Sequence, residues 1–336
     1  MKKRKLTMMM ILGTALIVLL AACGDHKRTS SARQTQEQPL ITSPSEKAAV
    51  VIENRGEKLV FPEAPKRAIT LNQHATEVML ALGLEESMVG TAYLDDRILP
   101  EFKAKYDKIP ILSEKYPSKE VFLAASPDFA YAGWESAFTE KSLGLRSDLA
   151  KQGVLTYVQE SSNKPSPTLE DVFQDILNIG RIFRVDGKAK QVVNDIRKKL
   201  EDIQARIGTV SKPLQVFVYD SGDDKAFTAA NTYLTSLINT VGAKNIFDDL
   251  NKGWTEVSWE EVVARNPDVI VVVDYGDTTA AKKIELLQNK ASLVDVDAIK
   301  NKRFIVLPLS AAAEGIRAPI ALQTLAEGLY PDQIQP

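Results

Sequence analysis

Residues 185–208 read VDGKAKQVVNDIRKKLEDIQARIG, and this stretch decides how the rest of the chain is divided. Apolar side chains recur every three or four residues, the period of one helical face, at Ala189, Val193, Ile196, Leu200, Ile203 and Ile207. Asp186 is a candidate N-cap, and Gly208 with Pro213 forms a stop signal. A helix of this length spans roughly 30 Å, about the diameter of a small domain. We interpret it as a strut joining two lobes; the alternative is a surface helix of one large domain.

Residues 1–22 predict a secretory signal peptide, because four basic residues precede an apolar run that ends in small residues. The sequence LAAC at its end resembles a bacterial lipobox, and Cys23 is the only cysteine of the 336 residues. No disulfide within the chain is therefore possible. We expect acylation of Cys23 to anchor the exported protein to the outer face of the bacterial cytoplasmic membrane. A plain signal peptide is the alternative. Residues 23–48 are polar and predict a lipidated flexible linker.

The composition disfavours nucleic acid as a partner. The chain has 42 basic and 44 acidic residues, and removal of residues 1–22 takes away four basic ones, which leaves a formal net charge near −6. An acidic chain without basic runs lacks the electrostatic footprint of a nucleic-acid binder. No other apolar run approaches membrane-spanning length. The remaining residues are enough for two lobes of ordinary domain size.

Short apolar runs alternate with helical patterns on both sides of the strut. After a β-hairpin around Gly56, the predicted strands of the first half are 68–71, 88–92, 129–132 and 154–158, and those of the second half are 214–219, 269–273 and 303–307. Helices are predicted from about Thr76, over 143–152 and from Thr168, where Asp171 three residues on gives a capping-box arrangement. Strands separated by helices indicate parallel sheets covered on both faces. The predicted organisation is α/β, with an N-terminal lobe at 49–185, a connecting helix at 186–208 and a C-terminal lobe at 209–336.

One segment is repeated between the halves. Residues 118–134 (SKEVFLAASPDFAYAGW) and 258–275 (SWEEVVARNPDVIVVVDY) share Ser, Glu, Ala, Pro and Asp in register, offset by 140 positions. Each reads as a helix, a Pro-Asp turn and a strand, and proline is expected there because it stops a helix. Chance similarity between short helix-turn-strand segments is the alternative.

Together these features resemble the class III substrate-binding proteins of ABC importers, the group that carries ferric siderophores, cobalamin and haem. The resemblance rests on PKRAITL at 65–71, TEVMLALGL at 76–84, the two repeated units and the helix at 186–207, and it covers nearly all of the mature chain. It implies two Rossmann-like lobes joined by a rigid helix, with the ligand in a cleft between them. It also implies that Glu120 and Glu260, equivalent in the repeat, dock on the dimeric permease, which works with its ATPase subunits. Helix capping by an acid in the first turn is the alternative for both residues.

The sequence lacks the common signatures of catalysis. It has no GxSxG, HExxH, Walker loop or GxGxxG after a strand. Only two histidines are present, which disfavours a bare transition-metal site. We expect no enzyme activity and no bound cofactor. The alternative from a different class is a tethered surface hydrolase, for which Asp95–Asp96 and Asp223–Asp224 are the visible carboxylate couples.

Candidate ligand-binding residues follow the carboxyl ends of the predicted strands, where open α/β sheets place their ligand crevice. They are Asn72, Gln73, His74, Tyr93, Tyr131 and Trp134 in the first half, and Tyr219, Asp220, Ser221, Tyr275 and Arg317 in the second, with Trp254 on a loop. Aromatic rings give flat contact area for a bulky chelate, and Arg317 can meet an anion bidentately. The alternative for Tyr131 and Tyr275 is core packing, and for His74 a place in a surface loop.

The expected ligand is a metal chelate, first of all a ferric siderophore. A single predicted basic residue favours a hydroxamate or carboxylate chelate over a highly charged catecholate. Cobalamin, haem or another bulky cofactor remains an alternative within the same fold.

Overall fold

The computed structural model describes residues 48–334, which belong to one compact unit of the chain. The signal peptide, Cys23 and nearly all of the linker lie outside the described residues. The strands are β1 Val50–Asn54, β2 Glu57–Phe61, β3 Ala68–Leu71, β4 Met88–Ala92, β5 Ile111–Ser113, β6 Phe129–Ala132, β7 Leu155–Val158, β8 Gln215–Tyr219, β9 Ala226–Ala229, β10 Lys244–Asn245, β11 Trp254–Val257, β12 Val269–Asp274 and β13 Phe304–Pro308.

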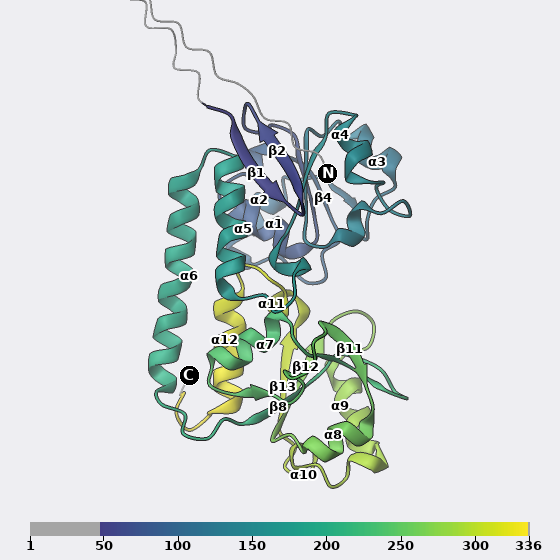
Figure 1. Cartoon of the computed structure of the whole chain (residues 1–336), viewed down its shortest axis with the longest axis vertical. Helices are drawn as coiled ribbons and strands as arrows, with labels where there is room; N and C mark the ends of the chain where they lie inside the picture. The colour runs from purple at the N-terminus through teal and green to yellow at the C-terminus, as the bar shows by residue number, and fades with distance from the viewer. Residues whose placement is uncertain (1–47, 335–336) are drawn as a thin grey trace, which may run out of the picture. The chain divides into compact units, whose positions relative to one another are not determined.

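The helices alternate with these strands (Figure 1). They are α1 Gln73–Ala81, α2 Lys103–Tyr106, α3 Lys119–Ala124, α4 Arg146–Ala150, α5 Leu169–Ile182, α6 Asp186–Ile207, α7 Tyr233–Thr240, α8 Trp259–Arg265, α9 Ala280–Asn289, α10 Asp297–Lys300, α11 Leu309–Ala312 and α12 Ala318–Leu329. The predicted alternation of strand and helix is confirmed.

Each lobe contains one parallel sheet with the same winding. The N-terminal sheet has the order β5-β4-β3-β6-β7, and the C-terminal sheet has the order β10-β8-β12-β13. In both sheets the first strand, β3 or β8, is central. The next strands are added on one side of it, and the later strands are added on the other side. This reversal creates a switch point, beside β3 in one lobe and beside β8 in the other. Two antiparallel pairs, β1-β2 and β9-β11, complete the sheets of the described residues.

The repeated segment has the same structural role in both lobes. Asp128 of the first Pro-Asp turn accepts hydrogen bonds from the backbone N–H groups of Lys66 and Arg67, at 2.8 and 3.0 Å, just before β3. Asp268 of the second turn accepts one from Gln215 N at 2.7 Å, at the start of β8. Each aspartate therefore satisfies backbone donors at the beginning of the neighbouring strand, which explains why both units keep it.

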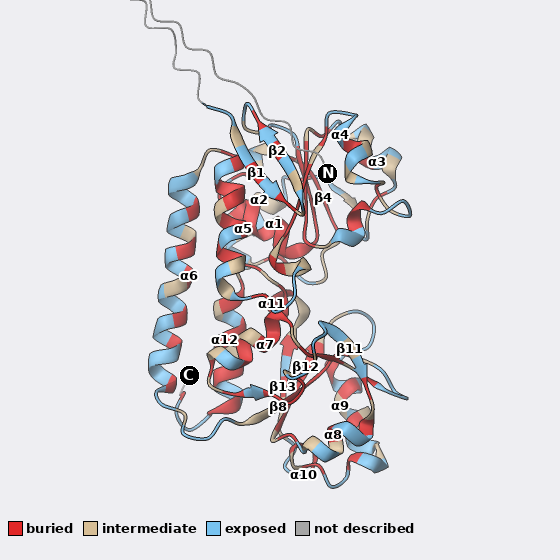
Figure 2. Cartoon of the chain, viewed as in Figure 1, coloured by how far each residue is buried: buried red, intermediate tan, exposed pale blue. Residues whose placement is uncertain are grey.

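The helix expected at 186–208 is present as α6, with Val185 rather than Asp186 as its N-cap. Its predicted apolar stripe is buried, as the red side of α6 shows in Figure 2. That stripe belongs to one continuous apolar core that also includes side chains of α5 and α12 and reaches both sheets. A Cβ at Gly180 of α5 would lie 2.3 Å from Cβ of Ala189, so glycine permits α5 and α6 to pack this closely. The helix is thus packed along its length against both lobes.

Several local expectations are corrected by the structure. The helix expected from Thr76 begins at Gln73, which places its first turn at the end of β3. The helix expected at 143–152 is reduced to α4, Arg146–Ala150. Trp254, expected on a loop, begins strand β11 and pairs with Ala229 of β9. The expected capping arrangement at Thr168 is confirmed, because Asp171 accepts a hydrogen bond from Thr168 N at 2.8 Å.

Candidate ligand-binding cleft

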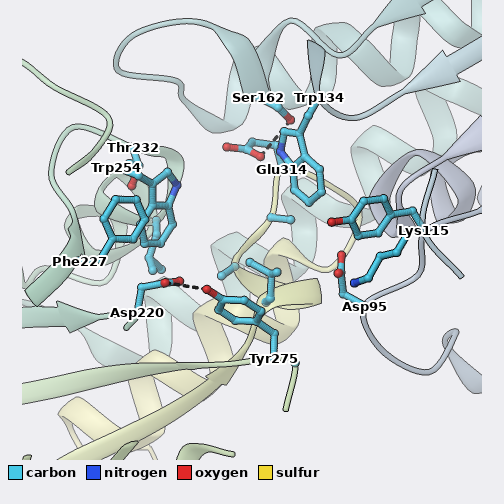
Figure 3. A pocket seen from close by; sticks show the side chains of 16 residues that line it. Asp95, Lys115, Trp134, Ser162, Asp220, Phe227, Thr232, Trp254, Tyr275 and Glu314 are labelled. Atoms are coloured by element: carbon cyan, nitrogen blue, oxygen red, sulfur yellow. Dashed lines mark hydrogen bonds between the residues drawn. The ribbon is translucent and has the colours of Figure 1, made fainter. Parts of the chain in front are cut away.

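A cavity of about 470 Å³ lies at the carboxyl ends of the strands of both sheets (Figure 3). The N-terminal lobe contributes segments that follow β4, β6 and β7, and the C-terminal lobe contributes segments that follow β8, β12 and β13. Its lining residues are Tyr93, Asp95, Lys115, Trp134, Ser162, Asp220, Phe227, Thr232, Leu234, Trp254, Tyr275, Gly276, Leu309, Ala312, Ala313 and Glu314. The volume is in the range of small-molecule sites.

Aromatic rings from both lobes face this cavity. Tyr93 and Trp134 come from the N-terminal lobe, with ring centroids 6.5 Å apart. Phe227 and Trp254 come from the paired strands β9 and β11, and their rings stack at 6.1 Å and 22°. Tyr275 follows β12. Figure 3 shows the rings of Phe227 and Trp254 across this space from the ring of Trp134. Rings arranged in this way can bind the faces of a bulky planar or cage-like ligand.

Asn72 holds the strand ends behind the first wall. Its backbone has φ 83°, an uncommon conformation for a residue other than glycine. Its N–H donates to Ala92 O at 3.0 Å, and its Oδ1 accepts from Gly133 N at 3.2 Å. Its side chain also bonds to Tyr116 Oη at 3.2 Å, and the Tyr116 ring packs 4.7 Å from that of Tyr93. Asn72 is fully buried and therefore positions cavity residues rather than lining the cavity.

His74 is buried behind Trp134, with the two ring centroids 5.0 Å apart. Burial lowers the pKa of His74 to about 4, so the ring is neutral at physiological pH. Its Nε2 is buried and has no hydrogen-bond partner among residues 48–334. A Cβ at Gly133 would lie 2.0 Å from that nitrogen, and a Cβ at Gly315 would lie 2.9 Å from the His74 Cβ. Glycines from both lobes thus permit the histidine to lie between them.

On the C-terminal wall, Asp220 accepts hydrogen bonds from the hydroxyls of Tyr275 at 2.7 Å and Ser221 at 2.8 Å, both at Oδ2. Lys283 supports this group from behind. Its ammonium donates to Val273 O at 2.7 Å and lies 4.4 Å from the centre of the Tyr275 ring. Burial, followed by the neighbouring Asp220, raises the pKa of Tyr275, so its hydroxyl stays protonated and donates to the carboxylate.

Glu314 joins the two lobes at the cavity. Its Oε2 accepts from Ser162 Oγ at 3.0 Å, and its backbone carbonyl accepts from the Gln159 side chain. Burial raises the pKa of Glu314 to about 7. The carboxyl group therefore changes charge near neutral pH at the surface of the cavity.

Arg317 lies outside the cavity, in a buried cluster that connects the lobes. Its Nε and one terminal nitrogen donate to both oxygens of Glu77, at 2.7 and 2.5 Å. Its other terminal nitrogen donates to Ser310 Oγ at 3.0 Å and to Asp96 Oδ2 at 3.3 Å. We call Arg317, Glu77, Asp96 and Ser310 the inter-lobe ion cluster. Glu77 lies on α1 and Arg317 immediately precedes α12, so the cluster joins an N-terminal helix to a C-terminal one.

Of the twelve candidate ligand residues, the structure brings five to the cavity: Tyr93, Trp134, Asp220, Trp254 and Tyr275. The other seven lie outside its lining: Asn72, Gln73, His74, Tyr131, Tyr219 and Arg317 are buried, and Ser221 bonds Asp220. Tyr131 is wholly buried and donates to Gln159 at 2.5 Å, and Tyr219 is buried and donates to Gly222 O at 2.8 Å. Asn72, His74 and Arg317 have the supporting positions described above. Gln73 bonds the backbone of residues 95–97.

Sequence reasoning did not assign Lys115, Ser162, Phe227, Thr232 and Glu314 to the cleft. Phe227 and Thr232 belong to the β9 region, whose strand was not predicted. Ser162 lies in a short 3-10 turn after β7, and Glu314 lies in the segment between α11 and α12, where no periodicity places a side chain. Asp95 was considered only as half of a catalytic couple. Its immediate position after Tyr93 and Leu94, beyond the end of β4, is the signal that identifies it.

Glu120 and Glu260 are exposed and occupy the same position, the second residue of α3 and of α8. In both helices a serine N-cap, Ser118 or Ser258, accepts a hydrogen bond from the backbone three residues later. A hydrogen bond with its own backbone and, to a smaller extent, one with the Ser118 side chain lower the pKa of the Glu120 carboxyl group. Both side chains are therefore available for contact with a partner.

Residues 48–334 contain neither a metal-binding cluster nor a membrane-spanning helix. No group of three or more His, Cys, Asp or Glu side chains there is arranged to hold a metal ion. No helix within the same range is long and apolar enough to cross a bilayer.

Residues 69–311 match the family model described as periplasmic binding protein. The chain belongs to this family. A crystal structure of a periplasmic binding protein from Veillonella parvula is 36% identical, with a TM-score of 0.79, and the alignment covers 85% of this chain and 99% of that one. Residues 48–334 of this chain therefore have the two-lobed class III fold that the sequence predicted.

Two curated relatives extend the comparison. The uncharacterized ABC transporter substrate-binding lipoprotein YvrC of Bacillus subtilis is 26% identical over 322 residues, 94% of each chain. The vitamin B12-binding protein of Pectobacterium atrosepticum is 27% identical over 222 residues, 64% of this chain and 74% of the relative. This periplasmic binding protein is a substrate-binding transport protein and not an enzyme, so the hydrolase alternative is wrong. Its carboxylate couples agree with that, since Asp96 is paired with Arg317 and Asp223 with Lys290.

Proposed function

We propose that the protein is the lipid-anchored solute receptor of an ABC importer and that it binds a metal chelate, first of all a ferric siderophore, in the cavity between its lobes. The observation that carries this proposal is the set of five aromatic rings from both lobes around one cavity, at the carboxyl ends of both sheets. Such a site offers broad, rigid apolar faces with a few polar groups, which suits a large chelate better than a small ion or sugar.

A corrinoid such as cobalamin is the second candidate. The relative named vitamin B12-binding protein supports it, and so does the chemistry of the walls. A corrinoid has a flat ring system for aromatic contacts and amide N–H groups for carboxylate acceptors such as Asp220. Either ligand makes the same use of Trp134 and Trp254.

Delivery would use the exposed glutamates of the two lobes. One carboxylate on each lobe, at equivalent positions, suits a permease dimer with two-fold symmetry. Attachment through Cys23 would keep the receptor beside that permease after export. The YvrC relative, whose name includes substrate-binding lipoprotein, supports this part of the proposal.

Calorimetric titration of the purified protein with ferrioxamine B and with cyanocobalamin tests the ligand class. We expect one of these chelates to bind, and Trp134→Ala to weaken that binding about tenfold or more, because it removes an aromatic wall. Ile320→Ala is the matched control, since Ile320 is a large exposed apolar residue of α12 that does not line the cavity. Binding unchanged by Trp134→Ala would remove this cavity as the site, and binding of neither chelate would refute the metal-chelate proposal.

A further inference from the structure

The ionisable side chains of the cavity are mostly acidic. Three carboxyl groups line it, those of Asp95, Asp220 and Glu314, and Lys115 is the one basic residue among the lining set. Figure 3 shows Asp220 beside Tyr275, Asp95 beside Lys115, and Glu314 near Trp134. Lys115 is exposed, lies 4.6 Å from the centre of the Tyr93 ring and forms no ion pair within 4 Å with any of residues 48–334. Its single positive charge, beside Asp95, cannot balance three carboxyl groups.

Hydrogen-bond acceptors in this wall are left for a ligand. Only Oδ2 of Asp220 is engaged by Tyr275 and Ser221, and no described residue bonds its Oδ1. The side chain of Asp95 has no hydrogen bond or ion pair among the described residues; only its backbone N–H is bonded, to Gln73. Thr232 is more than nine-tenths buried and lines the cavity, and its Oγ1 has no hydrogen-bond partner in the described part of the chain. These groups together form an incomplete hydrogen-bonding surface directed at the cavity.

Two further basic residues, Arg317 and Lys283, lie close to the cavity but outside its lining, and they cannot meet an anion. Arg317, which the sequence suggested for this task, has its donors engaged by Glu77, Asp96, Ser310 and the carbonyl of Arg97. Lys283 is buried behind Tyr275 with its ammonium on Val273 O. An anionic chelate in this cavity would face three carboxyl groups at short range with only the ammonium of Lys115 to offset them. Like charges in a partly desolvated site repel strongly.

We infer that the cavity selects chelates whose surface is cationic, or neutral and rich in N–H donors, and excludes anionic chelates. This inference rests on the proposed function and narrows it. Ferric complexes with free carboxylates or catecholate charge, and haem with its propionates, are disfavoured. Cationic hydroxamate chelates and amide-bearing corrinoids are favoured, because their N–H groups can reach Asp95, Asp220 and Glu314.

The test compares charge variants of a single chelate framework, so that shape is held constant. Ferrioxamine B carries a free ammonium, and its N-succinyl derivative replaces that ammonium with a carboxylate. Cyanocobalamin is neutral, and hydrolysis of one side-chain amide gives its anionic monocarboxylic acid. We expect that, within the framework that binds, the carboxylated member binds at least tenfold more weakly by calorimetry at neutral pH. This comparison uses the wild-type protein and does not depend on a variant that folds.

Variants then assign the effect to the cavity. Asp95→Asn removes a charge without removing a hydrogen bond of its side chain, and Glu314→Gln removes a carboxyl group that is partly ionised at neutral pH. The double variant should reduce the discrimination at least threefold. Asp195→Asn, on the exposed face of α6, is the charge-matched control and should leave it unchanged.

Each outcome has one meaning. Equal affinity, or tighter binding of the carboxylated member, would overturn the inference and leave the proposed function in place. Discrimination that persists undiminished in the double variant would also overturn it, because the carboxylates would not be its cause. Binding of neither framework would instead refute the proposed function itself.

Discussion

Removal of the Arg317 guanidinium should destabilise the protein strongly, because the inter-lobe ion cluster is buried. The side chain of Glu77 is 1% exposed and that of Arg317 is 8% exposed. Arg317→Met would leave the Glu77 carboxylate without its two charge-assisted hydrogen bonds and without water. Removal of one partner of a buried ion pair costs about 3–5 kcal/mol of unfolding free energy. For a chain of this size the melting temperature should fall by roughly 6–12 °C.

Differential scanning calorimetry and urea unfolding of residues 23–336 measure this change. Arg197→Met is the matched control, since Arg197 pairs with Glu170 at 2.5 Å but both side chains are largely exposed. Its cost should be about 0–1 kcal/mol. The double substitution Glu77→Leu with Arg317→Met should recover most of the loss, because apolar residues of similar volume often replace a buried pair without penalty. A melting temperature within about 2 °C of wild type for Arg317→Met alone would refute the reasoning.

Three further predictions concern delivery, anchoring and pH. Glu120→Gln with Glu260→Gln should abolish ligand uptake by cells while calorimetric affinity stays at the wild-type value; normal uptake would reduce both residues to helix caps. Cys23→Ala should release the protein from membranes or leave uncleaved precursor, and membrane-bound, normally processed protein on cell fractionation would contradict this. Burial raises the pKa of Glu314 from 4.5 to about 7, so the native state holds that proton more tightly, and stability should fall as pH rises through this interval. In urea unfolding, Glu314→Gln should reduce this loss of stability with rising pH. Some loss should remain, because burial also raises the pKa of the nearby Asp175, to about 6. An unchanged dependence of stability on pH would contradict the assignment to Glu314.

The parallel sheets were predictable because their central strands are continuous apolar runs bounded by turn residues. The expected strands 68–71, 88–92 and 129–132 coincide with β3, β4 and β6. The short strands β5, β9, β10 and β11 were missed. They are two to four residues long, and β9 and β11 depend on pairing with each other rather than on an apolar pattern of their own.

The site was predictable only as far as strand ends determine it. Tyr93 and Trp134 follow β4 and β6 directly, and the sheet topology brings such positions together. Arg317 shows where this reasoning fails. A loop arginine near a cleft can bind either a ligand or a buried acid. Which of the two Arg317 binds depends on Glu77, and the helical pattern of α1 does not show which residue pairs with Glu77. A pairing between residues 240 positions apart leaves no local trace in the sequence.

That separation also bears on how the chain folds. Glu77 is made early, on the helix that follows the first strand of the N-terminal sheet, whereas Arg317 follows the last strand of the C-terminal sheet. Contacts between distant residues tend to form late in folding, because the entropy of closing a long loop is lost before the contact can stabilise the chain. Before that contact forms, we expect the Glu77 carboxylate to remain hydrated at the edge of the N-terminal lobe. When the C-terminal lobe packs against this edge, the water is displaced, and the hydrogen bonds of Arg317 replace the hydration of Glu77.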